Sequence, residues 1–458
     1  MSQHPFSILP LRAELQDNLA SLEYHLMTPI QHESLPVILE GKDLIAQGKT
    51  GSGKTAAFGL GVLQQLDPTR FHVQTLVLCP TRELADQVAQ ELRRLARQIP
   101  NVKILTLCGG QPLGPQIGSL EHGAHIVVGT PGRIEEHLRK GTLRLDRLQS
   151  LVLDEADRML EMGFQPAVDA IVEQTPNTRQ TLLFSATYPR EIEAVAARIL
   201  RQPVRVEVAS VHQSGSIRQH FHRVAEEDRS AALCALLYHY RPVSAVVFCN
   251  TKQEVRDLES YLQQEGIAAV ALHGDLDQRQ RDQTLVRFSN QSASVLVATD
   301  VAARGLDIEG LDLVVNYRPS KESQVHVHRI GRTGRAGQSG VAVTLFSDRE
   351  GHKLAGIEAQ LDIVIQEEPV PSARVDGSYR PPMATLQLDV GKKQKIRPGD
   401  VLGALTNDSG IQGDEVGKIR VFDFCTYVAV SRPLAKDAVR QLSQGKIKGR
   451  SCRVRQLR

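Results

Sequence analysis

The segment Gly48–Thr55, which reads Gly-Lys-Thr-Gly-Ser-Gly-Lys-Thr, constrains the fold of this chain more than any other. Glycine-rich loops of this pattern turn their backbone N–H groups inward around phosphate oxygens. Residues 43–46 before the loop predict a short buried strand, and the apolar residues after it predict a helix whose N-terminus faces the anion. The segment therefore predicts an α/β unit that binds nucleotide phosphates.

Five residues of this loop are predicted to bind ATP. Gly51, Ser52 and Gly53 contribute to the phosphate cradle. Lys54 carries positive charge to the β and γ phosphates, and Thr55 offers its hydroxyl to Mg²⁺. The expected cofactors are thus ATP and Mg²⁺.

A second element, Leu151–Asp157, ends an apolar strand with carboxylates. Acidic residues after a strand usually form a solvated turn, but a phosphate loop in the same chain favours a catalytic role. Asp154 would then hold the metal through its water shell, and Glu155 would position and activate the attacking water.

The second half of the chain repeats this alternation of strands and helices. Short apolar strands, each ending at a polar or glycine loop, are expected at residues 246–251, 270–274 and 295–300. They imply a second parallel sheet without a phosphate loop of its own. Its contribution is expected from Arg332 and Arg335, because guanidinium forks can meet charge that develops on a transferred phosphoryl group. Their arginine- and glycine-rich run is equally typical of a loop that contacts nucleic acid.

Taken together, these motifs resemble those of the DEAD-box RNA helicases over about residues 1–365. The resemblance implies two RecA-like parallel-sheet domains and favours arginine fingers at Arg332 and Arg335. It implies three further nucleotide contacts, from Phe6 (stacking on adenine), Gln31 (the adenine edge) and Asp307 (the ribose hydroxyls). It also implies that Ser185, Thr187 and His328 link the nucleotide state to strand separation.

The same resemblance implies contacts with the RNA backbone from both halves of the core. The residues concerned are Pro80, Thr81, Arg82, Gly110, Thr130, Gly132, Arg133, Gly274, Gln278, Arg281, Thr299 and Arg304. Because backbone contacts carry little base information, this core is expected to bind RNA without regard to sequence.

Charge separates the end of the chain from the rest. Residues 381–458 carry fifteen Lys and Arg against seven Asp and Glu, a balance of +8 within a chain of net charge +3. A stretch rich in proline precedes them, and prolines stop both helices and sheet ladders. We therefore predict domains at 1–208 and 209–366, a linker at 367–382 and a third domain at 383–458.

The third domain is predicted to have β-α-β-β-α-β order, which is the layout of an RNA-recognition motif and gives a small α+β fold. Its aromatic signature is degenerate, and Phe422 and Phe424 are expected to share a strand face as core residues. RNA binding is expected instead from basic residues, which favour phosphate contacts. They are Lys392, Lys393, Lys395, Arg397, Lys446, Lys448 and Arg450.

This domain closely resembles the carboxyl-terminal domain of the DbpA subfamily of DEAD-box proteins. The resemblance implies that it recognises a hairpin of 23S ribosomal RNA and that the chain acts in assembly of the large (50S) ribosomal subunit. The expected function is an RNA-stimulated ATPase that unwinds short duplexes near this hairpin. An ATP-gated RNA clamp or assembly chaperone is the alternative, and a DNA helicase a weaker one.

The composition predicts a soluble cytoplasmic protein, and the chain is expected to be a monomer. No apolar run approaches the roughly 20 residues of a membrane span, and the first residues lack the charged-then-apolar order of a signal peptide. The six cysteines show no Cys-x-x-Cys pairing and are expected to be free thiols in a reducing compartment.

Overall fold

The computed structural model of the chain describes residues 4–48, 51–208, 217–303, 310–320, 322–334, 340–372, 379–406 and 411–457. These residues form two compact units, the first ending at residue 208 and the second beginning at residue 217. Three of the predicted site residues, Arg304, Asp307 and Arg335, lie outside the described residues. The predicted domain boundaries stay a prediction.

The first unit is built on a seven-stranded parallel sheet in the order β3-β4-β2-β5-β6-β1-β7. The strands are β1 Leu44–Gln47, β2 Thr75–Leu78, β3 Ile104–Leu107, β4 Ile126–Gly129, β5 Ser150–Leu153, β6 Gln180–Ser185 and β7 Val204–Glu207. The helices are α1 Ala13–Ser21, α2 Pro29–Leu39, α3 Lys54–Gln65, α4 Arg82–Leu95, α5 Leu113–Glu121, α6 Pro131–Arg139, α7 Ala156–Glu161, α8 Gln165–Val172 and α9 Arg190–Ile199, with a short 3₁₀ turn at Phe6–Ile8.

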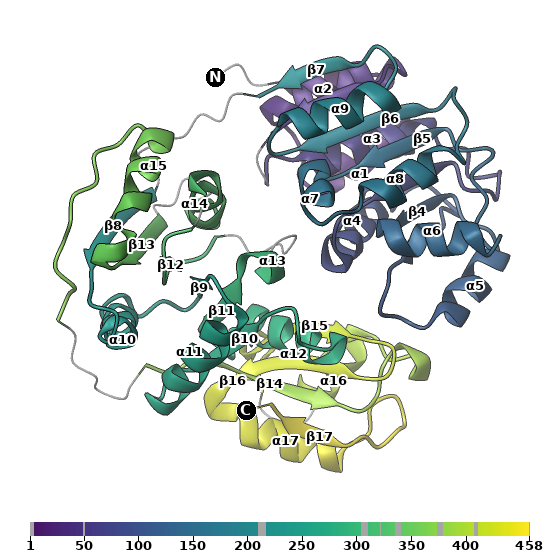
Figure 1. Ribbon diagram of the computed structural model, residues 1–458. Helices are drawn as coiled ribbons and strands as arrows, with labels where there is room; N and C mark the ends of the chain where they lie inside the picture. The colour runs from purple at the N-terminus through teal and green to yellow at the C-terminus, as the bar shows by residue number, and fades with distance from the viewer. Residues whose placement is uncertain are drawn as a thin grey trace. The chain divides into compact units, whose positions relative to one another are not determined.

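Helices cover both faces of this sheet (Figure 1). All residues of the central strands β2, β5 and β6 are therefore buried. One core contains residues of α1 to α4, and the other contains residues of α6 to α9. Alternate residues of a strand enter different cores: Val77 of β2 packs in the first, and Leu76 and Leu78 pack in the second.

The second unit contains a six-stranded parallel sheet in the order β10-β11-β9-β12-β13-β8. The strands are β8 Ile217–Arg223, β9 Ala245–Cys249, β10 Ala269–Leu272, β11 Val295–Thr299, β12 Leu313–Asn316 and β13 Gly340–Phe346. The helices are α10 Arg229–Tyr240, α11 Lys252–Gln264, α12 Gln278–Ser289, α13 Asp300–Ala303, α14 Ser323–Ile330 and α15 His352–Leu361, with a 3₁₀ turn at Asp348–Glu350.

A four-stranded antiparallel sheet, in the order β15-β16-β14-β17, completes the second unit. Its elements are β14 Met383–Leu388, α16 Pro398–Thr406, β15 Val416–Val421, β16 Thr426–Ser431, α17 Ala435–Gln444 and β17 Val454–Gln456, with 3₁₀ turns at Lys392–Gln394, Gly413–Glu415 and Arg432–Leu434. The predicted element order and the α/β plus α+β fold class are therefore confirmed. The prediction for the aromatics is wrong, because β15 ends before them: Phe424 is 67% exposed, and Phe422 packs edge-on against Tyr427.

The two faces of this small sheet are covered differently. One face packs on α16 and α17 and forms the core of the domain. The other face covers α12 (Figure 1), where the Gln283 amide lies 3.4 Å from the Tyr427 hydroxyl. Thr385 accepts a hydrogen bond from Asn290 at 3.2 Å and shares one with Ser292 at 2.7 Å. The second and third sheets therefore share a buried polar contact.

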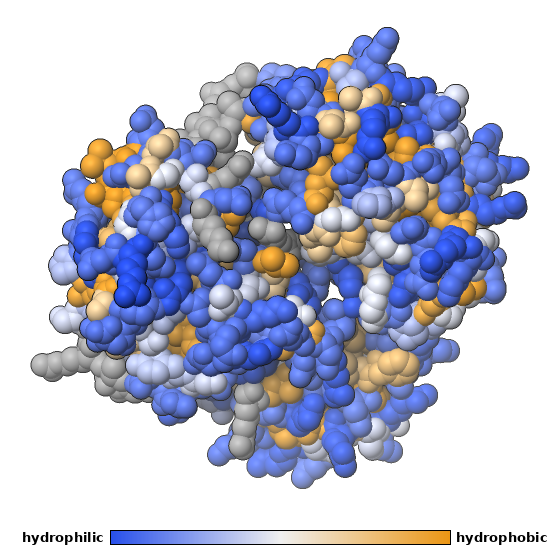
Figure 2. Space-filling view, in the orientation of Figure 1, coloured by the Kyte–Doolittle hydropathy of each residue, from blue (hydrophilic) through white to orange (hydrophobic). Residues whose placement is uncertain are grey.

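The molecular face drawn in Figure 2 is mostly hydrophilic, with apolar side chains in small patches. Within the part of the chain that the structure describes, no helix combines the length and the apolar character needed to cross a bilayer.

The contact between α2 and α3 allows a test of packing. A Cβ added to Gly61 would lie 2.2 Å from Cγ2 of the fully buried Ile38. We expect Gly61→Ala to lower the free energy of unfolding by about 1–3 kcal/mol, although alanine is the better helix former. The double variant Gly61→Ala with Ile38→Ala should lose clearly less free energy of unfolding than the two single variants lose together. Urea unfolding checks this, with Gly114→Ala as the control because nothing lies within 4 Å of its added Cβ.

Candidate nucleotide and RNA sites

The phosphate loop lies where the sequence predicts it, between β1 and α3. Gly51 (φ 75°) and Gly53 (φ 94°) adopt a backbone conformation that residues with a Cβ rarely adopt. Lys54 begins α3 and is 7% exposed, and its ammonium group donates to the Gly48 carbonyl at 2.5 Å. Thr55 follows it in the first turn of the helix. The loop therefore holds a buried positive charge next to a helix N-terminus, which is suited to an anion.

The predicted adenine-reading segment is bonded to this loop. Gln31 accepts from the Thr28 backbone N–H at 2.8 Å and donates to the Gly53 carbonyl at 3.1 Å. A Cβ on Gly53 would lie 2.5 Å from that amide nitrogen, on a backbone with φ 94°, so a residue with a side chain would be strained there and would displace Gln31. Phe6 is 3% exposed and packs in the first core. The adenine contacts of Gln31 and Phe6 stay predictions.

The acidic element follows β5 and lies close to the loop. Asp154 is 3% exposed, and its carboxylate accepts from the Glu155 backbone N–H at 3.0 Å. Burial raises the pKa of Asp154 to about 7, an effect that Lys54 opposes and Glu155 increases. Glu155 itself has φ 51° and precedes α7. A bound cation would favour the ionised form of Asp154.

The donor set at this position fits Mg²⁺. The Asp154 carboxylate and the Thr55 hydroxyl supply hard oxygen atoms, and Mg²⁺ is usually held by one or two carboxylates together with substrate phosphates and water. Across the described ranges, no group of three or more His, Cys, Asp or Glu side chains is placed to hold a metal. An ion at Asp154 would therefore depend on nucleotide phosphates for much of its coordination.

A chain of hydrogen bonds connects the loop with the predicted coupling segment. The Gly48 N–H donates to the Ser185 carbonyl at 3.0 Å, and the Ser185 hydroxyl donates to the Thr187 carbonyl at 2.6 Å. Thr187 donates to Asp157 through its backbone N–H at 3.0 Å and its hydroxyl at 2.9 Å. Asp157 is thus a site residue that we did not predict, although its place two residues after Glu155 was a visible signal.

The predicted RNA contacts of the first unit lie on loops at one edge of the sheet. Pro80, Thr81 and Arg82 follow β2, Gly110 follows β3, and Thr130, Gly132 and Arg133 follow β4. These three strands are adjacent and parallel, so their carboxyl ends meet. A Cβ on Gly110 would lie 2.4 Å from the Arg82 guanidinium, which shows how closely two of these loops approach.

Several predicted residues of the second sheet also lie at carboxyl ends of strands. Thr299 ends β11, Gly274 follows β10, and Gln278 and Arg281 occupy the first turns of α12. Arg281 donates to the Ala302 carbonyl at 2.8 Å, which ties this helix to the segment after β11.

The arginine-rich run contains a structural arginine that we did not predict. His328 and Arg329 lie in α14, and Arg332 follows the end of that helix. Arg329 is 2% exposed and forms a two-pronged ion pair with Asp300, at 2.6 and 2.7 Å. It also donates to Asn316 and to Asn250.

The basic residues of the third domain come together from two segments. The loop after β14 and the segment between α17 and β17 meet because β14 and β17 are neighbours in the sheet. Lys448 donates to the Lys395 carbonyl at 3.0 Å. The exposed basic residues of this surface are Lys392, Lys393, Lys395, Arg397, Lys446, Lys448 and Arg450.

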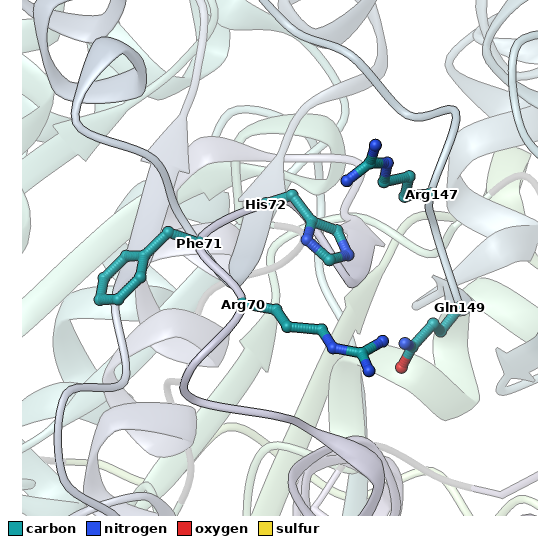
Figure 3. A pocket seen from close by; sticks show the side chains of 5 residues that line it. All are labelled: Arg70, Phe71, His72, Arg147 and Gln149. Atoms are coloured by element: carbon teal, nitrogen blue, oxygen red, sulfur yellow. The ribbon is translucent and has the colours of Figure 1, made fainter.

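A pocket of about 680 Å³ lies at the other edge of the first sheet, before β2 and β5 (Figure 3). It is lined by Arg70, Phe71, His72, Arg147 and Gln149. Nε of Arg70 lies 3.0 Å from Oδ2 of Asp67, and Nε of Arg147 lies 4.0 Å from Oδ2 of Asp146. Since the phosphate loop follows the carboxyl end of β1, this pocket is not part of the nucleotide site.

The parallel sheets and the phosphate loop define a P-loop ATPase with RecA-like domains. Family models match in three places: DEAD/DEAH box helicase at 28–195, the helicase conserved C-terminal domain at 228–337, and the DbpA RNA binding domain at 385–456. The ATP-dependent RNA helicase DbpA of Escherichia coli (strain K12) is 54% identical over 441 residues, 96% of each chain. This chain belongs to the DbpA family of DEAD-box ATP-dependent RNA helicases.

More distant relatives match the core. The DEAD-box ATP-dependent RNA helicase CshA of Bacillus cereus is 44% identical over 354 residues, 77% of this chain and 67% of that protein. The structure of S. cerevisiae Dbp5 bound to RNA and ADP BeF3 superposes with a TM-score of 0.73 and 29% identity, covering 80% of this chain and 96% of that one. The chain is therefore an ATPase and RNA helicase with an RNA-binding carboxyl-terminal domain, as the sequence predicted.

The bond between Thr187 and Asp157 can be tested by one substitution. We expect Thr187→Val to lower the free energy of unfolding of the first unit by about 1–2 kcal/mol, because the Asp157 carboxylate loses one donor. If this bond couples hydrolysis to unwinding, duplex release should fall more than RNA-stimulated ATP hydrolysis. Both rates are measured on the same protein, with Thr187→Ser, which keeps the hydroxyl, as the control. An equal loss of both rates would contradict the coupling role.

Proposed function

We propose that this chain is a bacterial cytoplasmic RNA helicase whose third domain anchors it to a hairpin of 23S ribosomal RNA while the core unwinds nearby short duplexes. The chain would act, as a monomer, in assembly of the large ribosomal subunit. The observation that carries the proposal is the match of residues 385–456 to the DbpA RNA binding domain beside a full helicase core.

The proposed hydrolysis depends on position and charge, since phosphoryl transfer needs little covalent chemistry. Lys54 would neutralise the β and γ phosphates, and Gly51, Ser52 and Gly53 would hold them through the backbone. Thr55 and Asp154 would hold Mg²⁺, partly through water, and the ion would neutralise phosphate charge. Glu155 would orient the attacking water and accept its proton.

The remaining site residues are assigned by family resemblance. Arg332 and Arg335 would stabilise the charge of the transition state, and Asp307 would bind the ribose. Ser185, Thr187 and His328 would pass the nucleotide state to the RNA contacts. ATP and single-stranded RNA together would favour the closed arrangement, in which the strand is bent and a short duplex loses base pairs locally.

An ATP-gated clamp or assembly chaperone is the alternative, in which unwinding is incidental. It predicts stable RNA binding with a non-hydrolysable ATP analogue and little release of duplex over many turnovers. A DNA helicase would be stimulated by DNA as strongly as by RNA. Duplex release under multiple turnover, with both nucleic acids, therefore separates the three.

The catalytic assignments predict a loss of turnover without a loss of anchoring. Lys54→Ala should lower RNA-stimulated hydrolysis at least about 100-fold, because a preorganised charge on the phosphates is removed. Glu155→Gln should do the same by removing the proton acceptor. Binding of the 23S hairpin, measured by fluorescence anisotropy, should stay within about twofold of wild type. Loss of hairpin binding in both variants would show that anchoring and catalysis are not separable.

The anchoring assignment is tested by steady-state ATP hydrolysis with a 23S hairpin fragment and with unrelated RNA of equal length. We expect the hairpin to stimulate more strongly, and the triple change of Lys392, Lys393 and Lys395 to Gln to remove the difference. The same changes should reduce the salt dependence of RNA binding.

The control for this triple variant is the change of Lys418, Lys436 and Arg440 to Gln, which removes equal charge from elsewhere in the domain. Point changes are preferable to truncation before the third domain, because truncation would expose the polar side of α12 that Thr385 and Tyr427 cover. If both RNAs stimulated ATP hydrolysis of the wild type equally, the third domain would not direct the helicase core to the hairpin, and the anchoring assignment would be wrong.

A further inference from the structure

A pocket of about 550 Å³ lies within the second unit, where the second and third sheets meet. The end of α11, the start of β10 and the end of α12 line one side, and the ends of the third sheet line the other. Arg287, Arg380 and Arg432 all contribute to its wall. None of its lining residues, all of which the structure describes, carries a carboxylate. The pocket therefore concentrates positive charge that its own wall does not neutralise.

Arg287 of α12 is the least satisfied of the three. Its Nε is buried and has no hydrogen-bond partner among the described residues. Burial lowers its pKa, against the weaker effect of Glu259. The Glu259 carboxylate itself accepts from the Ala271 backbone N–H at 2.9 Å. Buried polar groups normally have hydrogen-bond partners. An anionic ligand in the pocket would supply one for this guanidinium.

The other two arginines present charge in different ways. Arg432 is fixed by donating to the Pro381 carbonyl and, at 2.8 Å, to the Met383 carbonyl. Arg380 is exposed. Burial lowers the pKa of Arg432, and the positive charge of Arg380 lowers it further. The guanidinium of Arg432 is thus held by two carbonyl oxygens, and Arg380 is exposed to solvent. Planar guanidinium groups of this kind suit the paired oxygens of a phosphate.

We propose that this junction pocket binds a phosphate group of the RNA backbone, so that the second and third domains hold the RNA together. The inference rests on the proposed function in that the chain must bind RNA at its third domain. Met383 begins β14 beside the pocket, and the loop of Lys392 follows the other end of that strand. A strand of this length spans about 20 Å, so the pocket would take the RNA that flanks the anchored hairpin.

The test uses the full chain and a hairpin RNA with a single-stranded extension. Arg287→Gln with Arg380→Gln should weaken binding about five- to twentyfold at 0.15 M salt, and lower the slope of log K against log salt by about one to two. Arg440→Gln, which removes an exposed arginine of α17, is the control and should change neither. Hydrolysis with saturating unrelated RNA should stay at the wild-type level. Unchanged affinity and slope in the double variant would overturn the proposal.

Single variants and a phosphate titration distinguish RNA binding in the pocket from misfolding and from binding of a free anion. Arg380→Gln alone, at an exposed position, should give part of the loss of RNA affinity even if Arg287→Gln unfolds the protein. Arg287→Lys should bind RNA more tightly than Arg287→Gln but less tightly than wild type. Binding of inorganic phosphate to wild type but not to the double variant, with RNA binding unchanged, would assign the pocket to a free anion and overturn the RNA assignment. If the wild type failed to prefer the hairpin, the proposed function would fail first, and separately.

Discussion

Side chains bind carbonyl oxygens of the phosphate loop, and the geometry of the ATP site depends on these bonds. Gln31 donates to the Gly53 carbonyl, and Lys54 donates to the Gly48 carbonyl. The Gly48 N–H is bonded to Ser185 at the end of β6. When the carbonyl oxygens of glycine-rich peptide groups are bound on one side, their N–H groups point to the other side. There they can bind an anion.

The small sheet of the third domain shows why a familiar layout does not fix a mode of RNA binding. An RNA-recognition motif usually stacks bases on the open face of its sheet. In this chain Tyr427 of that face is 2% exposed, because α12 covers it. Bases cannot stack on a buried ring. This leaves the edges and loops of the domain, where the exposed lysines and arginines lie, as the surface that we propose for RNA.

Sequence reasoning succeeded where the determinants are local. The phosphate loop, the carboxylates after β5 and the order of the third domain all follow from short patterns. It failed where a role depends on a partner far along the chain. Arg329 is neutralised by Asp300, and α12 is covered by the third sheet, and neither pairing is visible in a local pattern. The error at Phe422 has a related cause, since the end of β15 is set by pairing with β16.

The contrast between Arg329 and Arg332 shows how one motif can hold two kinds of arginine. Arg329 lies in α14 and donates to a carboxylate and two amides, so it fixes the start of α13, directly after β11, against α14. The helix ends at Ile330, with Gly331 as its C-cap, and Arg332 is half-buried beyond that end. An arginine fixed in a buried ion pair cannot also move toward a nucleotide. Arg329 therefore holds this element in place, and Arg332, beyond the helix end, is the residue that we propose for the nucleotide.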